Sequence, residues 1–177
     1  SSLVTLDCHS NQLTTLNIAG LGTLENLACD TNQLSSLNLS GLSALNLFSC
    51  RMNQLTSLNL SGAPAITLFD CGENQISNLS LAGLSLVQAF CDDNQLISLN
   101  ATSVDFTAVT TFAATTNAAL TCIQVDNVAQ ANAVANLNMD VQTSFNTNCT
   151  ACTNPTLNMS STDVICTGGN SGTASVA

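Results

Sequence analysis

A repeat of about 21 residues runs through most of the chain, and it constrains the fold more than any other feature of the sequence. Its most regular mark is an asparagine followed by glutamine, with successive spacings of 21, 21, 21 and 20 residues at Asn11, Asn32, Asn53, Asn74 and Asn94. Self-similarity at such a period is typical of solenoids, in which a single unit cannot bury its apolar side chains alone. The sequence therefore predicts that successive repeats stack as turns of a solenoid.

Each repeat follows the pattern L-x-x-L-x-C-x-x-N-Q-L-x-x-L-x-L-S-G. The alternation of Leu27 and Cys29 fits a short strand, and Asn32 turns the chain while its side chain can satisfy buried backbone groups. Stacked strands of this kind form a parallel sheet with a spacing of about 4.8 Å. A sixth, less regular copy has alanine in the cysteine position and contains Val109, Phe112, Ala114 and Asn117.

This pattern resembles the leucine-rich repeat. The form with cysteine in the third leucine position, followed by "NQL" and "LNLSG", resembles repeats in surface proteins of flavobacteria and their relatives. The resemblance covers residues 1–120. It implies a leucine-rich-repeat solenoid, a right-handed superhelix with a parallel β-sheet on the concave face and a convex side that is mostly irregular, with short strands or 3-10 turns.

Two further segments resemble parts of the same proteins. Residues 120–149 resemble the segment that closes such arrays, so we assign 121–152 to a C-terminal cap with a short helix. A cap covers the strand edge and the core that a last turn would otherwise expose. Residues 154–177 are similar to the start of the SprB-type repeat of gliding-motility adhesins, so 153–177 is predicted to begin a β-rich module. The residues that carry this similarity are Cys166, Gly168, Gly169 and Gly172.

Five cysteines occupy the same position in successive repeats and form what we call the cysteine column, namely Cys8, Cys29, Cys50, Cys71 and Cys91. We interpret them as buried thiols that act as small apolar side chains. A string of disulfides is the alternative, but parallel stacked side chains do not point at one another as that bond requires. A metal ladder is a second alternative, but five cysteines without nearby histidine make a poor zinc site.

The other cysteines lie in and after the cap. Cys122 and Cys149 bracket the cap, and we predict that they form a disulfide, which would stabilise the fold by roughly 3–4 kcal/mol in the loop-entropy model. Cys152 forms a C-x-x-C with Cys149, which alone is weak evidence for redox chemistry. The pairing of Cys152 and Cys166 stays open.

Composition excludes several functions. One Lys or Arg stands against eleven Asp and Glu, and the net charge of −10 excludes nucleic acid and anionic membrane surfaces as partners. No apolar run is long enough to predict a membrane-spanning helix. With one histidine, no Tyr and no Trp, the chain offers no set of residues in plausible mechanistic roles, so we predict that it is not an enzyme.

The residues that vary between repeats face outward on the strands and just after them. We predict that they form a ligand-binding surface on the concave face, with apolar contact area from Leu47, Met52, Leu68 and Phe90. A competing explanation places charges there simply because the strand face is wet, with Arg51 and His9 as ordinary neighbours of Asp30. The predicted ligand-binding residues are Asp7, His9, Asp30, Arg51, Asp70, Glu73, Phe90, Asp92 and Asp93.

No metal or cofactor is predicted, with calcium as the alternative. Glu73 and Asp93 fall one repeat apart, with Asp70 and Asp92 close by. Like charges on neighbouring strands are destabilising, and a calcium ion, which binds several oxygen ligands, would relieve that repulsion.

These observations support two main functional hypotheses. In the first, the chain is a non-catalytic segment of a cell-surface adhesin, and its concave face binds a polysaccharide, a protein or a solid surface in adhesion or gliding motility. In the second, the repeats are a spacer or tip of a surface filament without a ligand of their own. A third hypothesis is self-association through the open first strand. The resemblance implies extracellular, outer-membrane-associated placement, type 9 secretion and neighbouring modules in the same large chain.

Overall fold

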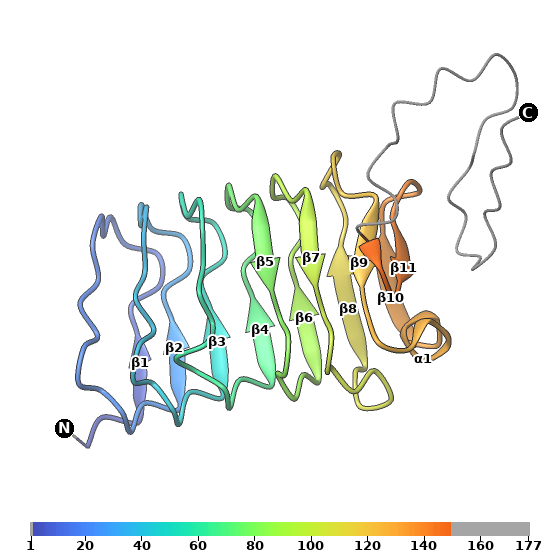
Figure 1. Cartoon of the computed structure of the whole chain (residues 1–177). Helices are drawn as coiled ribbons and strands as arrows, with labels where there is room; N and C mark the ends of the chain where they lie inside the picture. The colour runs from blue at the N-terminus through green and yellow to red at the C-terminus, as the bar shows by residue number, and fades with distance from the viewer. Residues whose placement is uncertain (1, 150–177) are drawn as a thin grey trace, which may run out of the picture.

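Short parallel strands stacked turn upon turn make up the computed structural model, which describes residues 2–149 (Figure 1). One strand from each turn joins a seven-stranded parallel sheet in the order β1-β2-β3-β4-β6-β8-β10. Neighbouring strands keep one register, so that Leu27 pairs with Phe48 and Phe48 with Phe69. The strands are β1 (Thr5–Asp7), β2 (Asn26–Ala28), β3 (Leu47–Ser49), β4 (Leu68–Asp70), β6 (Gln88–Phe90), β8 (Thr111–Ala114) and β10 (Asn136–Met139).

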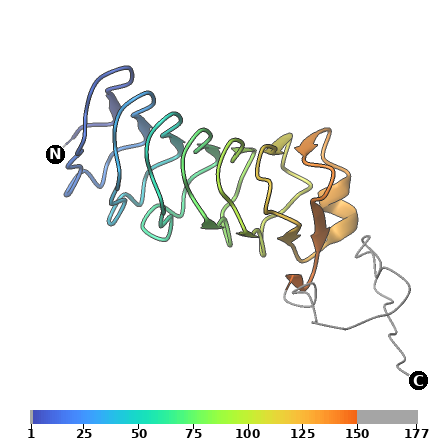
Figure 2. The same ribbon diagram turned by 90° about the horizontal axis from the view of Figure 1, so that it is seen from above.

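A second parallel sheet covers part of the opposite side, in the order β11-β9-β7-β5. Figure 2 shows the successive turns from above. Within residues 2–149, the turns before β5 contribute no strand to this sheet, and their outer segments are irregular. The sheet consists of β5 (Asn78–Ser80), β7 (Ser98–Asn100), β9 (Cys122–Gln124) and β11 (Ser144–Asn146). The fold is the predicted leucine-rich-repeat type of solenoid, with parallel sheets and short strands or irregular segments on the second side.

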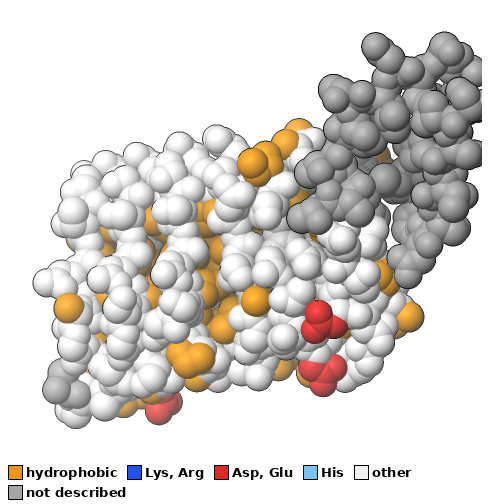
Figure 3. All heavy atoms as spheres, in the orientation of Figure 1, with side chains coloured by type: hydrophobic (Ala, Val, Ile, Leu, Met, Phe, Trp, Pro, Cys, Tyr) orange, Lys and Arg blue, Asp and Glu red, His pale blue; other side chains and the backbone are white. Residues whose placement is uncertain are grey.

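The core is a set of columns in which one turn lies directly on the next. The middle residue of β2, β3, β4 and β6 is buried, as with Leu27, Phe48 and Phe69. The rings of Phe48 and Phe69 lie with their centroids 5.8 Å apart. The face of the molecule seen in Figure 3 carries few charged side chains, and apolar side chains appear in the hollows between turns. The acids Asp7, Asp30, Asp70 and Asp92 lie in or two residues after strands of the seven-stranded sheet.

A buried asparagine ties each turn to the one before it. The side-chain nitrogen of Asn74 donates to the carbonyl oxygens of Cys50 (3.0 Å), Cys71 (3.1 Å) and Gly72 (3.1 Å), and its oxygen accepts the Leu55 N–H at 3.0 Å. Equivalent bonds recur in the other turns, and we call the set the asparagine ladder: Asn32, Asn53, Asn74, Asn94 and Asn117.

The residue just before each of these five asparagines, and the one before Asn11, adopts the left-handed conformation. Its φ lies between 51° and 57°, a region that costs a residue with a side chain about 1–2 kcal/mol. The positions are Ser10, Thr31, Met52, Glu73, Asp93 and Thr116. This sharp bend ends the strand and points the asparagine side chain back at the carbonyl groups that it satisfies.

The cysteine column is buried, as predicted. Cys29, Cys50, Cys71 and Cys91 are fully buried free thiols, and Cys8 is half-buried. Burial raises the pKa of the Cys29 thiol to about 12, and because the thiolate is the reactive form, such thiols are chemically inert. In the part of the chain that the structure describes, no group of three or more His, Cys, Asp and Glu is placed to hold a metal ion.

The C-terminal end of the stack is closed by β9, the short helix α1 (Val128–Asn132), β10 and β11. The Asn127 side chain caps the helix by accepting the Gln130 N–H. Cys122 and Cys149, the pair predicted from the sequence, form a disulfide. Cys152, Cys166 and the predicted module at 153–177 lie outside the described residues. Among residues 2–149, no helix has the length and hydropathy needed to cross a bilayer.

Candidate functional site

The outward side chains of the seven-stranded sheet differ from turn to turn, whereas the buried columns repeat. We call this surface the seven-stranded face. One outward column reads Ala28, Ser49, Asp70 and Phe90 along the stack, and the pairing of the strands places these residues side by side. A neighbouring column reads Asn26, Leu47, Leu68 and Gln88. A fixed scaffold therefore presents a surface of changing chemistry.

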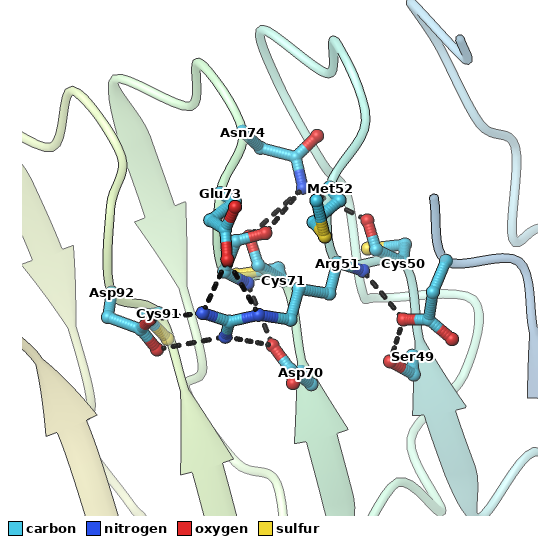
Figure 4. A network of polar contacts seen from close by, with 12 residues as sticks. Ser49, Cys50, Arg51, Met52, Asp70, Cys71, Glu73, Asn74, Cys91 and Asp92 are labelled. Atoms are coloured by element: carbon cyan, nitrogen blue, oxygen red, sulfur yellow. Dashed lines mark hydrogen bonds and ion pairs between the residues drawn. The ribbon is translucent and has the colours of Figure 1, made fainter. Parts of the chain in front are cut away.

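Arg51, which follows β3, is the centre of the polar contacts on this face (Figure 4). Its Nη2 lies 2.7 Å from Asp92 Oδ2 and 2.9 Å from Glu73 Oε1, and its Nη1 lies 3.4 Å from Asp70 Oδ1. Its Nε also donates to Glu73 at 3.1 Å. The guanidinium thus joins carboxylates from the next two turns, and we call this group the Arg51 cluster: Arg51, Asp70, Glu73 and Asp92.

Gly72 makes this reach possible. In the stacked register, the column that holds Arg51 continues with Gly72 and then Asp92, so Arg51 must cross the intervening turn to meet Asp92. A Cβ atom at Gly72 would lie 2.3 Å from Arg51 Nη1 and 2.9 Å from Cζ. The absence of a side chain at this position is therefore what leaves room for the guanidinium.

Burial and the guanidinium act on the carboxylates in opposite directions. Desolvation raises the pKa of Asp92, but hydrogen bonds to Arg51 and its positive charge outweigh it, so the pKa is lowered. At Asp70 desolvation dominates and raises the pKa, against the hydrogen bond from the Gly72 N–H and the charge of Arg51. On acidification, the stabilisation that Asp92 gives to the fold is lost as the pH falls through its lowered pKa. Asp70 acts in the opposite direction, because its protonation removes the cost of burying its charge.

We expect Gly72→Ala to displace Arg51 from Asp92 and to lower the free energy of unfolding by about 1 kcal/mol, the scale of a partly exposed ion pair. Carboxyl ¹³C NMR titration should show the pKa of Asp92 rising toward its ordinary value. The control is the same substitution in an Arg51→Gln background, where the added methyl group has no guanidinium to displace. An equal loss of stability in both backgrounds would contradict this role of Gly72.

The competing explanation, in which Arg51 pairs with Asp30 of the neighbouring turn, is wrong for the side chain of Arg51. Asp30 Oδ1 accepts the backbone N–H of Arg51 at 2.9 Å and the hydroxyl of Ser49. Those two donors share Oδ1 of Asp30, and the guanidinium turns the other way, over Gly72. Ser49 and Gly72 contact these residues but are not among the predicted site residues. The place of Gly72 in the column of Arg51 is the sequence signal that identifies it.

His9 pairs with Asp7 and not with Asp30. The two atoms His9 Nδ1 and Asp7 Oδ1 lie 2.5 Å apart, and the His9 backbone N–H also donates to Asp7. The hydrogen bond to Asp7, followed by its charge, raises the pKa of His9. The bond to His9 in turn lowers the pKa of Asp7. The pair is therefore fully charged between the lowered pKa of Asp7 and the raised pKa of His9.

Because His9 is the only histidine in the chain, its titration can be followed without ambiguity. We expect ring-proton NMR to give a pKa above 6.5, falling to about 6.5 in Asp7→Asn. The contribution of the ion pair to stability is complete below the unfolded-state pKa and is lost as the pH rises through the raised value. A pKa that stays unchanged in Asp7→Asn would show that Asp7 is not the partner.

The remaining predicted site residues lie at the same end of the strands. Phe90 is half-buried in β6 beside Asp70, its partner in register, and Asp93 is exposed at the left-handed position after that strand. Leu47 and Met52 are exposed by 36% and 46%, and the Thr31 hydroxyl donates to the Met52 sulfur at 3.7 Å. The face thus combines apolar side chains with carboxylates.

The crowding of carboxylates that suggested calcium is partly relieved by Arg51. Its guanidinium contacts Asp70, Glu73 and Asp92, which are three of the four acids concerned. Asp93, the fourth, lies beyond this contact set. A calcium ion at this place stays a prediction, and it would have to compete with the guanidinium for the same oxygens.

Comparison with known proteins yields one structural match. No protein-family model matches the sequence, and no curated protein matches it. The solved structure is a functional domain of InlJ from Listeria monocytogenes that includes a cysteine ladder; it has 20% sequence identity and a TM-score of 0.46. The match covers 79% of this chain and 49% of that chain, so this chain spans about half the length of the InlJ structure. A likeness at this level carries no functional conclusion.

Proposed function

We propose that this chain is a non-catalytic segment of a cell-surface adhesin and that the seven-stranded face binds an extracellular polysaccharide, protein or solid surface. The observation that carries the proposal is the contrast between columns. The buried positions repeat Leu, Phe, Cys and Asn from turn to turn, whereas one outward column changes from Ala28 through Ser49 and Asp70 to Phe90. A scaffold that needed only to span a distance would gain nothing from that variation.

The composition of the face supports a binding role. Leu47 and Met52 are large apolar side chains left in water. Leu47 stands in an outward column of the seven-stranded sheet, and Met52 follows Arg51 in the chain and lies close to it in Figure 4. Exposed apolar side chains rimmed by polar groups are typical of interaction surfaces. The network of ion pairs holds its members in place, which lowers the entropy cost of binding.

A screen with a matched control tests the proposal. Leu47→Ser/Met52→Ser removes the two exposed apolar side chains from the face, whereas Ile97→Ser removes one next to β7, in the other sheet, where Ile97 is 59% exposed. Both proteins and the unchanged chain are applied to neutral and charged glycans, extracellular proteins and hydrophobic or silica surfaces, with calcium and with EDTA. We expect the double variant to bind at least tenfold more weakly, a loss of binding free energy on the order of 1.4 kcal/mol. Ile97→Ser should bind as tightly as the unchanged chain.

The spacer hypothesis rests on a different observation, the asparagine ladder, which bonds each turn to its predecessor and stiffens the stack. The same screen separates the two functions. A folded chain that binds none of the probes, or binding that both variants reduce equally, would leave the spacer as the function. A loss of binding on EDTA treatment would favour the calcium alternative. Three expectations stay predictions: placement at the outer membrane, a part in gliding motility and a flavobacterial origin.

A further inference from the structure

The four-stranded sheet begins in the middle of the stack, and a groove lies along its first strand. β5 pairs with β7 on one side, and among residues 2–149 no strand pairs with its other side (Figure 1). Residues 58–61, in the outer segment of the preceding turn, form the opposite wall of a groove of about 520 Å³. We call this space the β5 groove, and its volume is in the range of small-ligand sites.

The two walls of the β5 groove are not joined by backbone hydrogen bonds. The N–H of Leu81 donates to the Asn100 carbonyl on the β7 side at 2.7 Å. Because alternate residues direct their backbone groups to opposite edges of a strand, the N–H and C=O of Ser80 face the groove. In the part of the chain that the structure describes, no backbone hydrogen bond links residues 78–80 to residues 58–61. The groove therefore contains main-chain donors and acceptors that are free to bind a ligand.

The side chains that line the β5 groove are uncharged. None of the lining residues is Asp, Glu, Lys, Arg or His. The buried ones include Leu58, Leu60 and Leu79, and the exposed ones include Asn59, Ser61, Asn78 and Ser80. The groove thus combines an apolar base with a polar, uncharged rim that is open to solvent.

Two asparagines on opposite walls have amide atoms to spare. Asn59 Oδ1 accepts the Ser61 N–H at 3.0 Å, and its Nδ2 forms no hydrogen bond within residues 2–149. Asn78 Nδ2 donates to Ser77 Oγ at 3.0 Å, and its Oδ1 accepts no hydrogen bond within the same residues. One wall therefore offers a free amide donor, and the other offers a free amide acceptor.

We propose that the β5 groove is a binding site for a neutral saccharide, separate from the seven-stranded face. The hydroxyl groups of a sugar both donate and accept hydrogen bonds, so they match the free amide atoms of Asn59 and Asn78 and the backbone groups of Ser80. The C–H faces of a pyranose ring match the leucines at the base of the groove. A charged sugar would lose water here without meeting an opposite charge, because the lining has none.

An extended peptide fits the β5 groove less well, although an edge strand is a common docking place for one. A strand inserted between the two walls needs them two strand spacings apart, about 9.6 Å. On the inner side of the same two turns, β3 and β4 pair directly, which holds these turns one spacing apart, about 4.8 Å. A saccharide does not have to enter the sheet, so it needs no such separation.

The test is a titration of the ¹⁵N-labelled chain followed by amide NMR. The neutral probes are cellohexaose, maltohexaose and mannohexaose, and the charged probes are hexagalacturonic acid and the chitosan hexamer. We expect a neutral probe to shift the amide signals of β5 and of residues 58–61, and Asn59→Ala/Asn78→Ala to weaken its binding about tenfold through the loss of two hydrogen bonds. The matched control is Asn38→Ala, because Asn38 forms the same bond one turn earlier, to the Ser40 N–H at 3.0 Å, outside the groove.

Several outcomes would overturn the proposal. These are a folded chain in which no neutral probe shifts the signals, a charged probe that binds as tightly as the neutral ones, and a loss of binding in Asn38→Ala as large as in the double variant. Shifts produced only by an extended peptide of alternating valine and threonine would assign the groove to a peptide. Leu47→Ser/Met52→Ser should leave groove binding unchanged, so this site and the seven-stranded face can fail independently.

Discussion

Replacing Asn74 with alanine should lower the free energy of unfolding by about 3–5 kcal/mol. The substitution leaves the carbonyl groups of Cys50, Cys71 and Gly72 and the N–H of Leu55 without their side-chain partner inside the stack. A buried polar group left unsatisfied costs about 1–3 kcal/mol. Because the chain has no Trp or Tyr, urea unfolding is best followed by far-UV circular dichroism.

Asn11→Ala is the matched control for this prediction. Asn11 is exposed and bonds only to carbonyls of its own turn, so its loss should cost about 1 kcal/mol or less in the 177-residue chain. A loss at Asn74 no larger than the loss at Asn11 would mean that water replaces the asparagine, and that the ladder contributes little to holding the turns together.

The second large effect is expected at the cap, where Phe145→Ala should cost about 3–5 kcal/mol. The ring is buried, with its centroid 5.5 Å from that of Phe106 and 5.9 Å from that of Phe112. Truncation leaves a cavity between the last turn and the cap. Hydrogen exchange should then show earlier opening of β9 and β11 than of the central turns.

Phe90→Ala removes the same atoms from the half-buried site on the seven-stranded face, and we expect it to cost about 1–2 kcal/mol. A Phe145→Ala loss that is no greater than this would contradict the view that the aromatic cluster seals the stack. A stable Phe145→Ala variant whose β9 amides exchange no faster would lead to the same conclusion.

The periodic part of the fold was predictable because each repeated position has one physical task. The spacing of the asparagines predicts stacked turns, and Cys29 and its equivalents occupy an inward position that the structure buries. The pairing of Cys122 with Cys149 follows from their places on either side of the cap. In these cases a residue type and a spacing together leave little choice of structure.

The contacts of the face could not be predicted in the same way, because a long side chain has several partners within reach. Arg51 stands next to Asp30 in one direction and near Asp92 in the other. The choice depends on Gly72, which opens the second path, and on Ser49 and the Arg51 N–H, which already occupy Asp30. The point at which the second sheet begins could not be predicted from the sequence either. The outer segments before β5 form no strand and those from β5 onward do, yet both kinds are rich in Asn, Leu and Ser.

The direction of the hydrogen bonds between turns has a mechanical consequence. They run along the axis of the stack, so a force pulling the two ends apart acts first on the bonds of a terminal turn. A turn of about 21 residues that peels away lengthens the chain by roughly 65–70 Å, its extended length less one strand spacing. The disulfide, with a sequence separation of 27, withholds the segment that it closes from this extension. Under tension the solenoid would therefore lengthen in steps of one turn, and the lengthening would end at the segment that the disulfide closes.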